Sequence, residues 1–280
     1  MAKIDYKKTL REFSRSPLGL FLREKLNIYP PAISLRYSEV SSDLFIWRDP
    51  NDWDTYFNLT HLGPILNPNY QDSYEALIEF YDAHGKLLGD AKVPLIYGVN
   101  ALTDIINLSS GKCTSGNSGT FAVFHLADKH AFFGDAKICI AERGFVSYKK
   151  RVDQSMLRSY AHGNANAIAY SMDNHKSRCL GVLQKSMHYF RCQLTLQDAV
   201  SSEIALVNFL DTDAEVGVYQ YKNNTKEKLT HITIHAGGLA LLKSGLDFDA
   251  TCLLEFESRI NFLRPVIFKH YQNHFDVLHG

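Results

Sequence analysis

The chain has 280 residues, of which 45% are hydrophobic and 21% are charged. This composition is that of a folded globular protein, and it excludes disorder for the bulk of the chain. Thirty Lys and Arg balance thirty Asp and Glu, so the chain lacks the basic excess of a dedicated nucleic-acid-binding protein. Its length is sufficient for two domains of ordinary size.

Residues 1–31 are predicted to form a separate N-terminal segment with a basic helix over 5–26. Ser16 followed by Pro17 matches an N-cap with proline in the first helical turn. The apolar residues of the segment recur at helical spacing: Phe13, Leu18, Phe21, Leu22 and Leu26. The basic face either lies on a membrane surface or a partner, or is the solvated face of a helix that covers a sheet edge.

The chain shows no apolar run long enough for a signal peptide or for a membrane span. Its five cysteines are dispersed without paired spacing, which is typical of reduced thiols in the cytoplasm. We therefore expect a cytoplasmic protein without a membrane span. Zinc-ligand spacings and nucleotide-binding motifs are also absent from the sequence, so we expect neither a metal nor a cofactor.

From residue 32 onward, short apolar runs alternate with turn signals, which is typical of antiparallel β-sandwiches. The turn at Gly85 closes a predicted hairpin, and 109–119 is the most loop-like stretch. The later strands are predicted near 121–125, 138–149, 166–172, 179–184, 188–197, 203–209, 215–221, 229–235, 238–243, 251–257 and 264–271. The predicted fold is all-β: two tandem antiparallel β-sandwich domains, 32–163 and 164–280.

The two predicted domains share a pattern that indicates an internal duplication. A strand that carries Asn58 corresponds to one that carries Asn208, and a hairpin and an apolar strand follow each of them. Toward the ends the offset settles near 116, where His162-Gly163 corresponds to His279-Gly280. The competing explanation is that any two sandwiches of short strands look alike.

This pattern resembles the Ig-like or fibronectin-type sandwich modules that are common in bacterial proteins. The resemblance is carried by Asn58 with the turn at 82–85, and by Asn208 with the turn at 222–225 and Gly237-Gly238. It implies a fold that usually binds, spaces or scaffolds, and it assigns no activity.

The candidate ligand-binding residues lie between the two proposed copies, where clefts tend to form. Alternation in an extended segment would place Arg158, Tyr160 and His162 on one face. Arg offers a fork for carboxylate or phosphate, Tyr a hydroxyl and a ring, and His a titratable donor. The full predicted set is Glu142, Arg143, Tyr148, Arg158, Tyr160, His162 and Asn164. An anionic or neutral sugar suits this mixture; the alternative is a linker that fastens one sandwich to the other.

The sequence therefore favours a non-catalytic binding or assembly module, associated with carbohydrate or cell-surface glycan metabolism, with its ligand cleft along 142–166. Its partners would be a carbohydrate or small anionic ligand, or another protein; nucleic acid is not expected. The enzyme alternative is a sugar- or glycan-acting hydrolase that uses Glu142 and His162 as an acid–base pair, with Arg143 and Arg158 holding an anionic group. A third class is a structural subunit, and exposed edge strands would favour a homodimer.

Overall fold

The structure is a computed structural model. It describes residues 38–97, 99, 101–128, 140–151, 159–195, 199–223, 225–243, 251–261 and 263–279, together with Leu18, Leu22, Lys25 and Leu35. Apart from three of those single positions, the predicted N-terminal helix over 5–26 lies outside the described residues.

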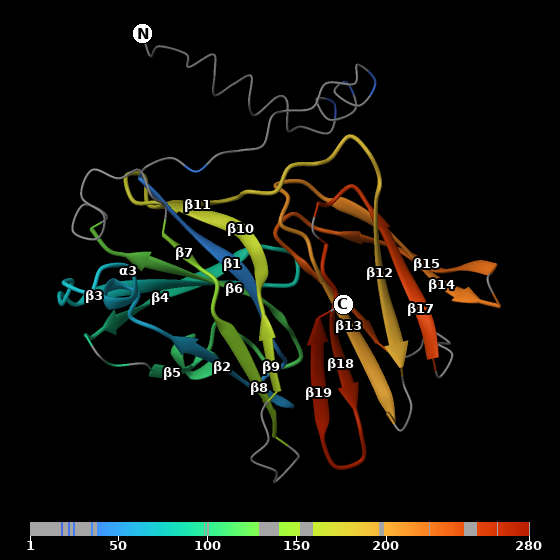
Figure 1. The fold of residues 1–280 in the computed structure, drawn as a ribbon, viewed down its shortest axis with the longest axis horizontal. Helices are drawn as coiled ribbons and strands as arrows, with labels where there is room; N and C mark the ends of the chain where they lie inside the picture. The colour runs from blue at the N-terminus through green and yellow to red at the C-terminus, as the bar shows by residue number, and fades with distance from the viewer. Residues whose placement is uncertain are drawn as a thin grey trace.

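The described residues form an all-β fold in which antiparallel pairing dominates, as predicted (Figure 1). We call the first set of strands the N-terminal unit: β1 (Glu39–Trp47), β2 (Trp53–Leu59), β3 (Tyr74–Tyr81), β4 (Leu87–Leu95), β5 (Ala101–Asp104), β6 (Gly119–Leu126), β8 (Phe145–Lys150) and β9 (Ser159–His162). The short helices α3 (Gly63–Leu66) and α4 (Ile105–Leu108) lie in its connections.

The strands of the second set, the C-terminal unit, lie on the right of Figure 1. They are β12 (His188–Thr195), β13 (Ser201–Val207), β14 (Ala214–Lys222), β15 (Thr225–Ile234), β16 (Leu239–Lys243), β17 (Thr251–Ser258), β18 (Val266–His270) and β19 (Phe275–His279). Three further strands belong to neither set: β7 (Ala141–Glu142), β10 (Asn164–Ser171) and β11 (Lys176–Cys179).

The two units have the same strand order. In the N-terminal unit the sheets run β1-β6-β3-β4 and β5-β2-β8-β9, and in the C-terminal unit they run β12-β17-β14-β15 and β16-β13-β18-β19. The eight strands from β12 to β19 therefore correspond, in chain order, to β1 to β6, β8 and β9. The hairpins and strands that the sequence comparison paired, from β2 with β13 to β9 with β19, hold the same places in this order.

The pairing is nested, because β3 pairs with β4, β2 with β5 and β1 with β6. This arrangement folds a long hairpin over two facing sheets, as in jelly-roll sandwiches. It differs from the immunoglobulin order, in which the first two strands are neighbours in one sheet, because β1 and β2 lie in different sheets.

Alternation of side chains builds the core between the sheets. Along β2, Trp53, Phe57 and Leu59 are buried, whereas Asn58 is exposed. Phe57 packs edge-on against Phe45 of β1 and Phe121 of β6, with ring centroids 4.7 and 5.8 Å away. Aromatic pairs of this kind hold the two sheets of the N-terminal unit together.

β10 and β11 extend the sheet of the N-terminal unit, although they follow residue 163 in the sequence. β10 pairs antiparallel with β1, from Glu39 opposite Ser171 to Leu44 opposite Asn164, and β11 pairs with β10. The division of the chain at 163/164 stays a prediction, and this pairing favours a boundary after β11.

The two units pack directly against each other. The ring of Trp53 in β2 lies 5.8 Å from that of Phe268 and 4.8 Å from that of Phe275 in the C-terminal unit. At the edge strands, the Val277 N–H donates to Ser159 Oγ at 2.8 Å. These contacts bring the ends of β1 and β8 next to β13 and β18. Among the described residues, no helix is long and apolar enough to cross a membrane.

Candidate ligand site between the two units

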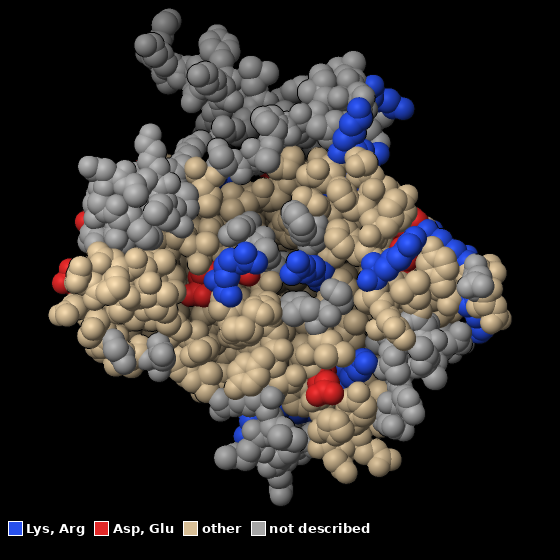
Figure 2. Space-filling model, in the orientation of Figure 1, with Lys and Arg blue, Asp and Glu red and all other residues tan. Residues whose placement is uncertain are grey.

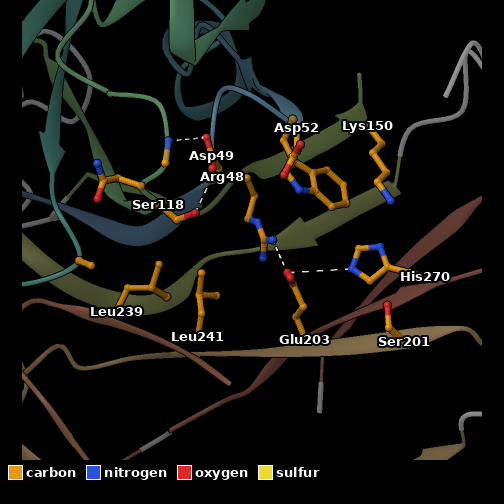
Figure 3. Close-up of a pocket in the computed structure, with 14 residues that line it drawn as sticks. Arg48, Asp49, Asp52, Ser118, Lys150, Ser201, Glu203, Leu239, Leu241 and His270 are labelled. Carbon is orange, nitrogen blue, oxygen red and sulfur yellow. Dashed lines mark hydrogen bonds and ion pairs between the residues drawn. The ribbon is translucent and has the colours of Figure 1, made fainter. Parts of the chain in front are cut away.

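A polar cavity of about 430 Å³ lies where the two units meet (Figure 3). The N-terminal unit contributes the turn after β1, the loop before β6 and the end of β8; the C-terminal unit contributes β13, β16 and β18. The residues that line it are Arg48, Asp49, Asp52, Trp53, Ala83, Gly116, Asn117, Ser118, Lys150, Ser201, Glu203, Leu239, Leu241 and His270. A junction between units is a frequent place for a ligand site.

Arg48 is the central side chain of this cavity and is only 4% exposed. Its guanidinium carbon lies 4.4 Å from the ring centroid of Phe268 and 5.1 Å from that of Trp53, which are cation–π contacts. Nη2 donates to Glu203 Oε2, whereas the buried Nε and Nη1 have no hydrogen-bond partner among the described residues. A buried donor without a partner is unfavourable. Nε and Nη1 of Arg48 are therefore two donors that an anion can use.

His270 faces the same carboxylate from β18. Its Nε2 lies 4.0 Å from Glu203 Oε2, and within the described part of the chain its buried Nδ1 has no hydrogen-bond partner. Burial lowers the pKa of His270 below the ordinary value of 6.5; Lys150 and Arg48 act in the same direction, and Glu203 opposes them. The ring therefore tends to stay neutral, and it would become cationic more readily beside an added negative charge.

The rim carries charges of both signs. The Lys150 side chain projects from the end of β8 toward the cavity in Figure 3. Asp49 has a structural role, because Oδ1 accepts the N–H groups of Asn51 at 3.0 Å and Gly116 at 2.9 Å. Asp52 adds a further carboxylate at the rim. The lining can therefore donate to an anionic group and also accept hydrogen bonds from hydroxyls.

The residues predicted from the sequence lie mostly elsewhere. Glu142 is buried, and its Oε2 lies 2.6 Å from Nε2 of the fully buried His125. Nδ1 of that histidine lies 3.0 Å from the hydroxyl of Tyr74, which accepts the Leu62 N–H at 2.9 Å. Because the Tyr74 oxygen accepts a hydrogen bond from the Leu62 N–H, we infer that the Tyr74 hydroxyl donates to His125 Nδ1 and that the Nε2–H of His125 donates to Glu142 Oε2. This chain of polar groups lies inside the N-terminal unit.

Tyr148 is also an interior residue. It is fully buried, and its hydroxyl donates to the Ile46 carbonyl at 3.0 Å. Burial raises the pKa of this hydroxyl well above its ordinary value of 10. Its ring packs against Phe268 of the C-terminal unit, with centroids 5.1 Å apart. Tyr148 therefore contributes to the packing between the units and is not among the residues that line the cavity.

The remaining predicted residues lie on the surface or outside the described part of the chain. Arg143 is more than half exposed, with Nε 3.7 Å from Asp43 Oδ1. On the β8–β9 pair, Tyr160 is exposed and the ring of His162 lies 4.1 Å from that of Phe145. Two further residues complete the predicted set: Asn164 begins β10, with its backbone paired to Leu44, and Arg158 lies outside the described residues.

The sequence predicted a ligand cleft along 142–166, between the two sandwiches; the cavity also lies between the two units, but none of the predicted residues is among those that line it. The run from Arg48 to Asp52 was not among the predicted site residues. One signal was available, since an Arg that directly follows a buried strand and precedes Trp53 combines a charged and a large aromatic group at one strand end. Its partners Glu203 and His270 lie more than 150 residues away, and no local pattern points to them.

Within the described part of the chain, no group of three or more His, Cys, Asp or Glu side chains is arranged to hold a metal ion. No protein-family model matches the chain, and no curated protein matches it in sequence.

Proposed function

We propose that this protein is a non-catalytic binding or assembly module, whose ligand site is the cavity between the two units. The observation that supports this best is Arg48, a buried guanidinium held between aromatic rings, whose Nε and Nη1 have no partner among the residues that the structure describes. A guanidinium in that setting is positioned to bind a carboxylate or phosphate. In the structure, Nη2 of this guanidinium is paired with the Glu203 carboxylate.

The lining favours a ligand with one negative charge and several hydroxyls, such as an acidic sugar. Arg48, Lys150 and the Nδ1 side of His270 can interact with the anionic group. The carboxylates of Asp49, Asp52 and Glu203 line the same cavity; they accept hydrogen bonds from hydroxyls and repel a ligand with several negative charges. This selectivity supports a role in carbohydrate or glycan metabolism.

A nucleic-acid ligand is not favoured. On the side of the molecule drawn in Figure 2, the basic side chains of the described residues lie singly or beside acidic ones. The charges of the whole chain also balance. A polyanion needs a continuous basic face to release its counterions, and this mixed distribution does not provide one on that side.

The two units are proposed to be products of an internal duplication. The equal strand order supports this, as does the agreement between that order and the sequence comparison, which places His162 and His279 at the ends of β9 and β19. The cavity is lined in part by equivalent elements of the two units, because Lys150 ends β8 and His270 ends β18, which hold the same place in the strand order.

The test is a thermal melt of the purified protein with glucuronate, glucose and citrate. A ligand that binds only the folded state raises the melting temperature by mass action. We expect glucuronate to raise it, and glucose and citrate to do so much less. The variant Lys150→Ala should reduce the glucuronate effect, because it removes a cation at the rim without touching the core.

Lys149→Ala is the matched control, because Lys149 is the neighbouring residue of the same strand and does not line the cavity. It should keep the full glucuronate effect. A protein that none of the three compounds stabilises, or an effect that both lysine variants weaken equally, would count against this site.

A further inference from the structure

The outer edge of β12 differs from every other sheet edge among the described strands. β12 lies at the end of the β12-β17-β14-β15 sheet, beside β17 in Figure 1. It pairs with β17 over eight consecutive residues, from His188 to Thr195, without a register shift. A long regular edge strand presents a row of N–H and C=O groups that can pair with another strand.

The N-terminal unit shows how such an edge is covered. β1 holds the place in the strand order that β12 holds in the C-terminal unit. β1 pairs with β6 on one side and with β10 on the other, and all nine of its residues are buried. β12 has no described strand on its second side. Tyr189 and the Arg191 side chain are each 57% exposed.

Other sheet edges carry features that prevent pairing. The β3–β4 and β14–β15 pairs each contain a register shift. The edge strand β4 includes Gly89, Asp90, Lys92 and Pro94, and β15 includes two lysines. β5, β9 and β11 have only four residues each, and β16 and β19 have five. β12, His-Tyr-Phe-Arg-Cys-Gln-Leu-Thr, contains no Pro, Gly or Lys, so it lacks these protective features.

We propose that the β12 edge pairs antiparallel with β12 of a second copy of this chain, which joins two C-terminal units through one continuous sheet. Charge favours a second copy as the occupant. On this face Arg191 pairs with Glu255, and Lys226 pairs with Glu255 and Glu257. Two sheets with such balanced charges can join edge to edge without like-charge repulsion. A symmetric pair closes the edge completely.

The register follows from the same charges. A twofold axis through Cys192 places Arg191 of one copy opposite Gln193 of the other, whereas an axis through Arg191 would place the two guanidinium groups opposite each other. Like charges directly opposite are destabilising in a sheet. We therefore assign the axis to Cys192, so that each dimer contains two Arg191–Gln193 cross-strand pairs.

The test is analytical ultracentrifugation of the full chain from about 1 to 200 µM, a range in which mass action resolves a weak dimer. We expect a species of twice the 31.8 kDa monomer mass. Gln193→Lys places a cation opposite Arg191 in both pairs and should raise the dimer Kd about tenfold. Gln193→Glu places a carboxylate there and should lower the Kd. Both changes are at an exposed position.

Thr225→Lys is the control, because it adds the same charge at an exposed position on β15, at the opposite edge of that sheet. It should leave the Kd unchanged. A chain that stays monomeric over the whole range overturns the proposal. A dimer that responds equally to Gln193→Lys and Gln193→Glu, or that responds to Thr225→Lys, overturns it too, since its interface then lies elsewhere.

Discussion

The guanidinium of Arg48 and the carboxylate of Glu203 form an ion pair that joins the two units, although the residues are 155 positions apart in the sequence. Their side chains are 4% and 17% exposed. A buried pair of this kind contributes little over an apolar pair, but loss of one partner leaves an uncompensated charge. The stability of the junction between the units therefore depends on a negative charge beside Arg48.

Glu203→Gln should lower the free energy of unfolding by about 3 kcal/mol, because it leaves the Arg48 charge buried without a counter-charge. Added glucuronate or sulfate should then raise the melting temperature of this variant more than that of the wild type, because the anion replaces the lost carboxylate. Thermal melts of both proteins with and without anion provide the measurement. Equal shifts in the two proteins would show that Arg48 does not receive the anion.

His270 should make stability depend on pH between neutrality and mild acid. Its folded-state pKa is lowered by burial from 6.5, so below that value the unfolded chain binds more protons than the folded one. The free energy of unfolding therefore falls as the pH drops through this window. His270→Gln should make the melting temperature less dependent on pH between 7.5 and 5.5. The prediction fails if the wild type and His270→Gln show the same dependence of melting temperature on pH.

The turn that ends in Gly85 should tolerate no side chain. Gly85 has φ +74°, and a Cβ there would lie 1.9 Å from the Ala236 carbonyl oxygen across the junction. Gly237 has a similar φ of +67°, but its nearest neighbour would be Cys179 Sγ at 3.5 Å. Gly237→Ala should cost only the backbone strain, about 1 kcal/mol. Gly85→Ala should cost about 3 kcal/mol or more, since backbone must also move; chemical denaturation measures both. Equal losses would mean that the turns do not touch as described.

Local pattern was enough to predict most of the strands, although the strand predicted near 179–184 was wrong beyond Cys179, where β11 ends. Period-two alternation identifies β2 and β14, and the turn at Gly85 fixes the β3–β4 hairpin, because each signal depends on neighbours within a few residues. The comparison of the two halves also paired elements that hold equal places in the strand order. Short strands such as β5 and β19 were not predicted, because four or five residues contain too little alternation to detect.

Long-range pairing limited the prediction of the site. Glu142 was predicted to be a ligand-binding residue, because nothing near it in sequence shows that His125 lies 2.6 Å away. Arg48 was not predicted to be a site residue, because its ion pair depends on how the units pack. Nested sheets bring such residues together across the chain, and burial of a charged group becomes visible only once that packing is known.

Glu142 also offers a test between the binding module and the hydrolase alternative. A general acid must reach the leaving group of its substrate, but Glu142 is 4% exposed and its carboxylate faces His125 within the N-terminal unit. We therefore expect a structural role. Glu142→Gln should lower the free energy of unfolding by about 1–3 kcal/mol, because a charge-assisted hydrogen bond to a buried partner is lost.

Chemical denaturation measures that loss, and Glu75→Gln is the matched control. Glu75 pairs with Lys92 at 3.1 Å, but both side chains are more than half exposed; removing such a pair changes stability by less than about 1 kcal/mol. Glucuronate should stabilise Glu142→Gln as much as it stabilises the wild type, since the cavity at Arg48 is intact. If Glu142→Gln instead keeps full stability and loses the glucuronate effect, the carboxylate belongs to the ligand site and the hydrolase alternative regains support.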